Sequence, residues 1–206
     1  MPRSQTKLKI IEAALALFAK QGVSQVKLQH IADEVGISVG NLAYHFKHKE
    51  ELIETVHKQG LQALEEVLKA FLEAPGFYDF DRQLSLFYHF STRYHFCFSC
   101  NREIHLHQPQ LAASWQDQLH KFFLQICKRL DLYQKKGWLQ TEWWDGCYEQ
   151  LAHNIFLCCC YWLPQQQFVE GASSSMAFRQ AIWSQIRPYL SPQGNSLYAQ
   201  TNQLAH

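Results

Sequence analysis

The chain has 206 residues, of which 47% are hydrophobic, and its formal net charge at pH 7 is only +1. This length allows either one large domain or a small domain joined to a larger one, with a sizeable buried core. Aromatic residues reach 14% while charged residues are held to 18%. That balance is typical of a packed protein with additional buried surface, such as a pocket or a subunit interface.

The cysteines argue against a disulfide framework. There are seven, an odd number, and three of them are consecutive at 158–160 within an apolar run. They indicate the reduced thiols of a cytoplasmic protein. No signal peptide is visible, and no run reaches the ~18 apolar residues of a membrane span. We therefore expect a cytoplasmic protein that has no membrane partner.

Helical spacing dominates the first part of the chain, where alternating β-branched residues are nearly absent. Apolar stripes predict a helix over about 8–20, a short helix over 28–35 and a second short helix after Ser38. Ser38 is a suitable N-cap, since its hydroxyl can accept a bond from a free backbone N–H. A long helix is expected from about Lys49 to the breaker pair at 75–76.

The second part also has the spacing of helices. Residues 82–107 are rich in aromatic side chains and histidine. Helices are expected over 111–136, 143–163 and 178–190, because each apolar pattern stops at Gly or Pro. The polar tail beyond Pro192 is expected to fray. The sequence thus predicts an all-α fold of about nine helices.

Residues 28–46 have the layout of a helix-turn-helix. Gly36 supplies the permissive residue of a tight turn between two short helices, and Ala32 is small where those helices approach. The start of the second helix is the part that meets base edges in the major groove. Residues 1–50 also carry seven Lys/Arg against four acidic residues. The side chains presented outward are Val39, Gly40, Asn41, Ala43, Tyr44 and His45.

The stretch from Thr6 to Val56 resembles the DNA-binding region of the TetR family of repressors. The matching stretches are IIEAALALFAKQGV, IADEVGISVGNLAYHF and KHKEELIETV. The resemblance implies a helix-turn-helix DNA-binding domain over 1–50 and a larger helical effector-binding and dimerisation domain over 51–206. It departs at Lys27, where the family commonly has Ser or Thr, and at Ala43, where an aromatic is common. These departures bear on the operator sequence, not on the fold.

The resemblance also implies roles in DNA binding. Residues near the start of the second helix would touch phosphates or bases, the start of the third would face base edges, and its end and the start of the fourth would hold phosphates. In that order these residues are Lys27 and Gln29; Val39, Gly40 and Asn41; Tyr44, His45 and Lys49. Ser38 and Ala43 complete the predicted DNA-binding set.

The aromatic side chains of the larger domain are candidates for an effector pocket, because such residues can line a site for a flat or greasy ligand. Ordinary core packing is the alternative for each of them alone. The predicted pocket residues are Phe87, Phe90, Tyr94, Phe98, Trp115, Phe122 and Phe123.

Residues 89–107 also hold thiols and imidazoles, which suit Zn²⁺ or Cu⁺. They are His89, His95, Cys97, Cys100, His105 and His107. Only one CxxC pair is present, so we predict no metal site. A metal site, a redox-sensing pair and buried thiols with scattered surface histidines stay open as interpretations.

The run Ile155–Leu163 has nine consecutive apolar residues, so both sides of its helix must be buried. A partner protomer can cover one side, giving a four-helix interface about a two-fold axis. Burial within a single chain is the alternative. The predicted dimer residues are Ile155, Cys159, Trp162, Phe178, Ile182 and Ile186.

Together these features predict a ligand-responsive transcription regulator that binds a palindromic double-stranded operator as a homodimer. By the family's usual mode it would be a repressor that a small-molecule effector releases from DNA. No cofactor is expected, and the chain has no GxSxG, HExxH, Walker or GxGxxG motif of an enzyme. An enzyme with an unmarked site and a pure interaction module are the alternatives from other classes.

Overall fold

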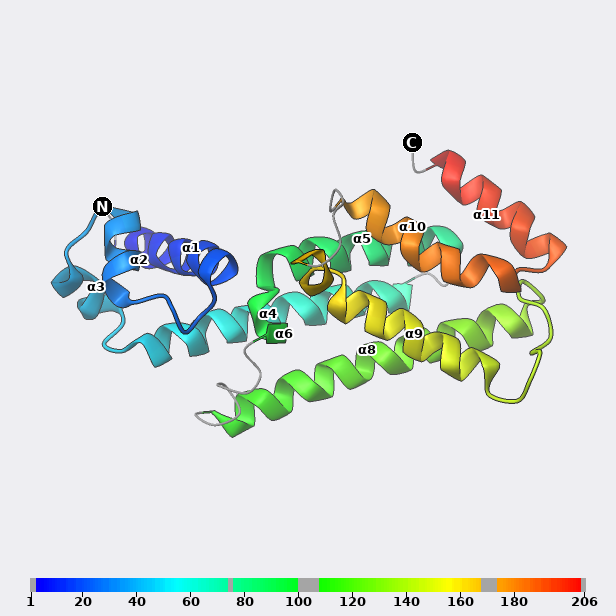
Figure 1. Cartoon of the computed structure of the whole chain (residues 1–206), viewed down its shortest axis with the longest axis horizontal. Coiled ribbons are helices and arrows are strands. Elements are labelled where there is room, and N and C mark those ends of the chain that lie inside the picture. The colour runs from blue at the N-terminus through cyan, green and yellow to red at the C-terminus, as the bar shows by residue number, and fades with distance from the viewer. Residues whose placement is uncertain (1–2, 74–75, 100–107, 168–173, 205–206) are drawn as a thin grey trace. The chain divides into compact units, whose positions relative to one another are not determined.

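The fold is all-α, as predicted. The computed structural model of the chain describes residues 3–73, 76–99, 108–167 and 174–204. Over these ranges it has ten α-helices and no strand, apart from an isolated bridge between Leu139 and Leu190 (Figure 1). No helix in the described ranges is both long enough and apolar enough to cross a bilayer.

The helices of the first half are α1 (Arg3–Gln21), α2 (Leu28–Val35), α3 (Val39–His45), α4 (Lys49–Glu73), α5 (Phe77–Tyr94) and α6 (Phe96–Ser99). Those of the second half are α8 (Pro109–Lys135), α9 (Cys147–Tyr161), α10 (Ser175–Ile186) and α11 (Pro192–Leu204). Short 3₁₀ segments at Pro164–Gln167 and Arg187–Tyr189 follow α9 and α10.

The turn between α2 and α3 forms as its sequence predicts. Gly36 ends α2 with φ of 72°, a left-handed conformation that glycine adopts without a Cβ penalty. Ser38 is the N-cap of α3, and its hydroxyl accepts a hydrogen bond of 3.1 Å from the backbone N–H of Asn41. These local signals fix the start and the direction of α3.

The prediction of a frayed C-terminal tail is wrong. Residues Pro192–Leu204 form α11, whose Tyr198 ring lies 4.8 Å from the Trp183 ring of α10. Thr201 is buried as well. Contacts with a helix earlier in the chain therefore stabilise α11, whose own polar sequence gives little indication of it.

By its contacts the chain divides into two compact units. Unit 1 comprises Met1–Ala63 and Thr92–Trp115, and unit 2 comprises Leu64–Ser91 and Gln116–His206. The long helices α4 and α8 each contribute to both units. The domain boundary predicted after residue 50 falls inside unit 1.

Unit 1 joins the helix-turn-helix to later parts of the chain. Phe18 of α1 packs against Phe96 of α6, with 5.7 Å between ring centroids. Arg93 at the end of α5 donates a hydrogen bond of 2.5 Å to Glu12 of α1. The segment at 92–96 therefore belongs to the same packed body as the N-terminal helices.

Unit 2 has an aromatic core between α5, α8 and α10. The Phe87 ring stacks on the Phe122 ring at 4.5 Å and lies 6.3 Å from the Phe178 ring. Buried Asp81 forms an ion pair with Arg179 and accepts a bond of 2.9 Å from the Trp183 indole. Apolar packing and one buried ion pair thus hold α10 on α5.

Candidate functional site

The predicted DNA-binding residues lie on the surface of unit 1, at the start of α2, along α3 and at the start of α4. Leu42 of α3 and Phe46, the residue that follows this helix, are fully buried, which turns the other faces of α3 outward. Six of the predicted residues are exposed: Lys27, Gln29, Ser38, Gly40, Asn41 and Tyr44. The other four are partly exposed: Val39, Ala43, His45 and Lys49.

A hollow of about 490 Å³ lies beside α3. Asn41, Tyr44 and His45 line it together with Thr6 and Lys9 of α1. Sequence reasoning missed the two α1 residues. Their spacing of three places both on one face of that helix, and this spacing was the signal available.

Lys49 has a structural contact in addition to its predicted role. Its ammonium donates a hydrogen bond of 2.5 Å to the backbone carbonyl of Val23, in the segment between α1 and α2. This bond ties the first turn of α4 to the helix-turn-helix. A phosphate contact from the same ammonium stays a prediction, since an ammonium has three donors.

The seven predicted pocket residues are divided between the two units. Phe87, Phe90, Phe122 and Phe123 belong to unit 2, while Tyr94, Phe98 and Trp115 belong to unit 1. Most of them are buried against other rings, such as Phe87 against Phe122 at 4.5 Å. None of them lines the three hollows described in this section and below. These ring contacts are compatible with core packing inside each unit, and an effector pocket lined by these residues stays a prediction.

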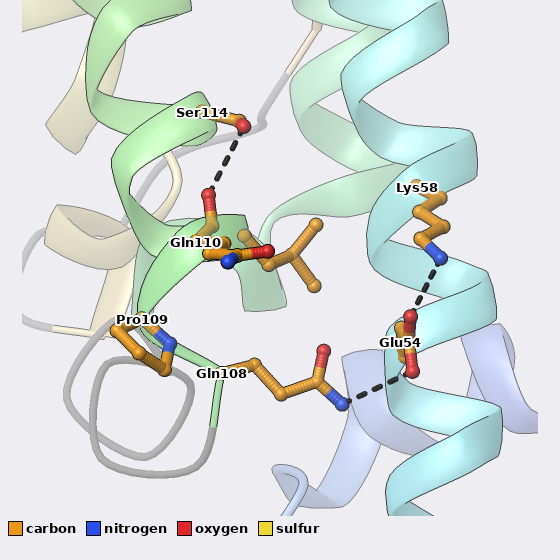
Figure 2. Close-up of a pocket in the computed structure, with 7 residues that line it drawn as sticks. Glu54, Lys58, Gln108, Pro109, Gln110 and Ser114 are labelled. Carbon is orange, nitrogen blue, oxygen red and sulfur yellow. Dashed lines mark hydrogen bonds and ion pairs between the residues drawn. The ribbon is translucent and has the colours of Figure 1, made fainter.

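A polar pocket of about 490 Å³ lies in unit 1 between α4 and the start of α8. Figure 2 shows Gln108 reaching to Glu54, which lies on α4 next to Lys58. The hydrogen bond from Lys58 lowers the pKa of Glu54 below its ordinary value. Glu54 is thus an ionised acceptor that links α4 to Gln108, the residue directly before α8.

His57 of α4 is a buried polar group of unit 1. Its side chain is 1% exposed, its ring lies 5.1 Å from the Trp115 ring, and its Nδ1 has no hydrogen-bond partner. Burial lowers the pKa of His57 to about 4. The imidazole is therefore neutral at physiological pH, and no pattern in the sequence indicates its burial.

The Cys/His stretch is only partly described. Cys100, His105 and His107 lie outside the described residues, and Cys97 is fully buried. Within the described ranges no three His, Cys, Asp or Glu side chains group as metal ligands do. In α9, burial raises the pKa of the Cys158 and Cys159 thiols, and that of Cys160 to about 12. These three thiols stay protonated and are poor nucleophiles.

Most of the predicted dimer residues are buried within unit 2. Trp162 is partly exposed, whereas the other five are buried: Ile155, Cys159, Phe178, Ile182 and Ile186. Buried side chains have no surface left for a partner. Helices α9 and α10, which pack on each other, instead expose the apolar side chains of Leu157, Tyr161 and Met176.

Comparison with known proteins decides the family. A profile described as "Bacterial regulatory proteins, tetR family" matches residues 10–56, and one described as "Bacterial transcriptional repressor" matches residues 61–198. The chain belongs to the TetR family. Members of this family are DNA-binding transcription regulators, not enzymes.

Individual relatives of this TetR-family chain match over different lengths. The HTH-type transcriptional regulator YerO of Bacillus subtilis is 44% identical over 50 residues, which is 24% of this chain and 17% of that protein. The curated relatives are matched over only 17–34% of either length. Their similarity therefore supports the DNA-binding segment and leaves their ligands and partners as properties of those proteins.

Solved structures match nearly the whole chain. A TetR-family regulator from Marinobacter aquaeolei VT8 has a TM-score of 0.78 at 19% identity, over 96% of this chain and 97% of that one. A gamma-butyrolactone receptor described as an ArpA-like protein has a TM-score of 0.69 at 16% identity, over 98% of this chain and 99% of that one. At these identities the likeness shows the TetR fold alone.

Proposed function

We propose that this TetR-family regulator represses transcription as a homodimer on a palindromic operator and leaves DNA when a small-molecule effector binds. The exposed α3, capped by Ser38 and backed by buried Leu42 and Phe46, is the observation that carries the proposal. DNA reading would reside in residues 1–50, and effector binding and dimerisation in 51–206.

The chemistry of the α3 surface suits DNA. Asn41 can read a base edge, and Tyr44, 64% exposed, can donate its hydroxyl to a phosphate. Gly40 lets the backbone approach the groove. Lys27, Lys9 and His45 supply further donors around this helix, so phosphate contacts would make binding dependent on salt.

The exposed face of α9 and α10 is our proposed dimer surface. Leu157 and Tyr161 are one helical turn apart on α9 and are 52% and 63% exposed, and Met176 of α10 is 51% exposed. Large exposed apolar groups of this kind mark protein interfaces. Two protomers would present their reading helices about 34–36 Å apart, one turn of DNA.

Helix α4 is the proposed route from effector to DNA. Its first turn is bonded to the α1–α2 segment through Lys49 and Val23, and its residues contribute to both units. An effector that favours one position of α4 would shift the reading helices. It can do so only by as much as its affinity differs between the two states.

The test is a mobility shift on the intergenic DNA upstream of the protein's own gene, at two salt concentrations. We expect sequence-selective binding by two protomers or a multiple of two, weakening steeply with salt. Changing Tyr44 and His45 together to Ala should lower affinity at least tenfold, about 1.4 kcal/mol. Tyr78→Ala, at an exposed tyrosine of α5, is the matched control and should bind as the unaltered protein does.

Equal binding by the Tyr44/His45 variant and the control would contradict the assigned surface. Selective DNA binding that no small molecule weakens, across a broad effector screen, would contradict the release step while leaving DNA recognition intact.

A further inference from the structure

A groove of about 360 Å³ lies between α4 and α8 within unit 2. Its volume falls in the range of ligand sites, roughly 300–1,000 Å³. Leu68 and Phe71 line it from α4, and Leu124 lines it from α8. Leu124 is 41% exposed, so an apolar strip meets solvent along the groove.

Lysine side chains surround this apolar strip. Lys121 and Lys128 are seven residues apart on α8 and therefore share one face of it, and Lys69 lines the groove from α4. Lys69 and Lys121 bond to acidic neighbours on their own helices at 2.6 and 2.7 Å. Exposed pairs of this kind contribute only about 0–1 kcal/mol, so both ammonium groups can turn to another anion.

The third lysine is unpaired: within the described part of the chain, Lys128 has no carboxylate in ion-pair reach. Of the side chains that line the groove, three are cationic and only Glu65 is anionic. Because Glu66 and Asp117 pair with Lys69 and Lys121, Lys128 is the groove lysine that has no ion pair with a described residue, and it lies beside an apolar surface.

A buried cation lies behind the groove wall. The Arg129 guanidinium lies 4.6 Å from the ring centroid of Phe71, and the residue is 1% exposed. It donates to Gln83 at 3.2 Å and to the Gly76 carbonyl and the Tyr133 hydroxyl at 3.4 Å each.

No carboxylate of the described residues pairs with Arg129, and its buried Nε has no hydrogen-bond partner. Burying an unpaired cation is costly. A nearby anion would reduce that cost, because charges attract more strongly in a low-dielectric interior than in water.

We propose that the α4–α8 groove of unit 2 binds a small amphipathic anion, a carboxylate on an apolar body. The carboxylate lies between Lys121 and Lys128, and the apolar body lies along Leu124 and Phe71. The positive charge of Arg129 adds to the attraction from behind Phe71. Neutral analogues lose the charge interaction and amines are repelled. This site does not depend on the proposed release from DNA.

The test is isothermal titration of the full chain with decanoate, decanol and decylammonium, each below its micelle concentration. We expect saturable binding of decanoate and at least tenfold weaker binding of the other two. The variant Lys121→Gln/Lys128→Gln should lower decanoate affinity at least tenfold. Lys20→Gln/Lys135→Gln removes the same charge at exposed positions outside the groove and should leave it unchanged.

A second variant tests the apolar strip. Leu124→Gln keeps every charge and should also weaken decanoate binding several-fold, with circular dichroism confirming that the helices are intact. Decanoate binding that is unchanged in both groove variants, or decanol binding as tight as decanoate, would overturn the proposal. The mobility shift without ligand is measured separately, so a failure of DNA recognition is distinguishable from a failure of this site.

Discussion

At the scale of single residues, a change at Gly40 can test folding and the proposed DNA binding separately. A Cβ added there would meet only the Ser38 hydroxyl, at an ordinary 3.9 Å. Gly40→Ala should therefore keep or raise stability, by up to about 1 kcal/mol from helix propensity. The added methyl would stand between the α3 backbone and DNA and should lower operator affinity about tenfold. Thermal melting and mobility shifts check the two parts, and unchanged affinity would place the DNA elsewhere.

At the same scale, the burial of His57 predicts how the free energy of unfolding depends on pH. Its pKa is lowered from 6.5 to about 4 by burial, so the unfolded chain binds the proton more tightly than the folded one. The free energy of unfolding should then fall as pH drops from about 7 toward 4, by up to about 3 kcal/mol.

His57→Leu removes this titration and also the unpartnered Nδ1. Urea unfolding at a series of pH values should give the variant a flatter profile than the unaltered protein, with no loss of stability at pH 7. Parallel profiles would show that His57 is not the group responsible.

At the scale of elements, the docking of α11 depends on a close approach. A Cβ on Gly194 would lie 2.1 Å from the Trp138 carbonyl oxygen, which also accepts a bond of 2.9 Å from the Ser191 backbone N–H. Gly194→Ala should push α11 away, weaken the Tyr198–Trp183 contact and destabilise unit 2 by about 1–3 kcal/mol.

Hydrogen exchange of α11 measures this loss directly. Ser196→Ala, at an exposed position two residues away, is the control and should change stability by less than about 0.5 kcal/mol. Full protection of α11 in the Gly194 variant would contradict the close approach.

Elements differ in how far their own sequence predicts them. The α2–α3 turn follows from Gly36 and Ser38, because left-handed turns and N-caps are local signals. Helix α11 depends on Trp183, which no pattern within its own sequence reveals. The run Ile155–Leu163 predicts burial, but only the rotation of α9 decides that Ile155 points inward while Leu157 points outward.

At the scale of the whole molecule, DNA binding and effector binding differ in how far the sequence predicts the residues of their sites. The proposed DNA-binding surface is local in sequence, so a motif of nineteen residues, 28–46, is enough to predict it. An effector site brings together side chains from distant helices, and the seven aromatic candidates fall into two units. The groove lined by Phe71 and Lys128 joins residues 57 positions apart, and no spacing rule links them.

The last whole-molecule prediction concerns assembly. Leu157→Glu/Tyr161→Glu places two carboxylates on the exposed face of α9, so the fold should persist while the proposed dimer separates. Sedimentation should show a monomer with unchanged helical content. A monomer makes half the phosphate contacts, so operator affinity and the slope of its logarithm against salt should both fall, the slope by about half. Leu86→Glu, at an exposed leucine of α5, should remain dimeric. A dimeric α9 variant would move the interface to another face of the protein.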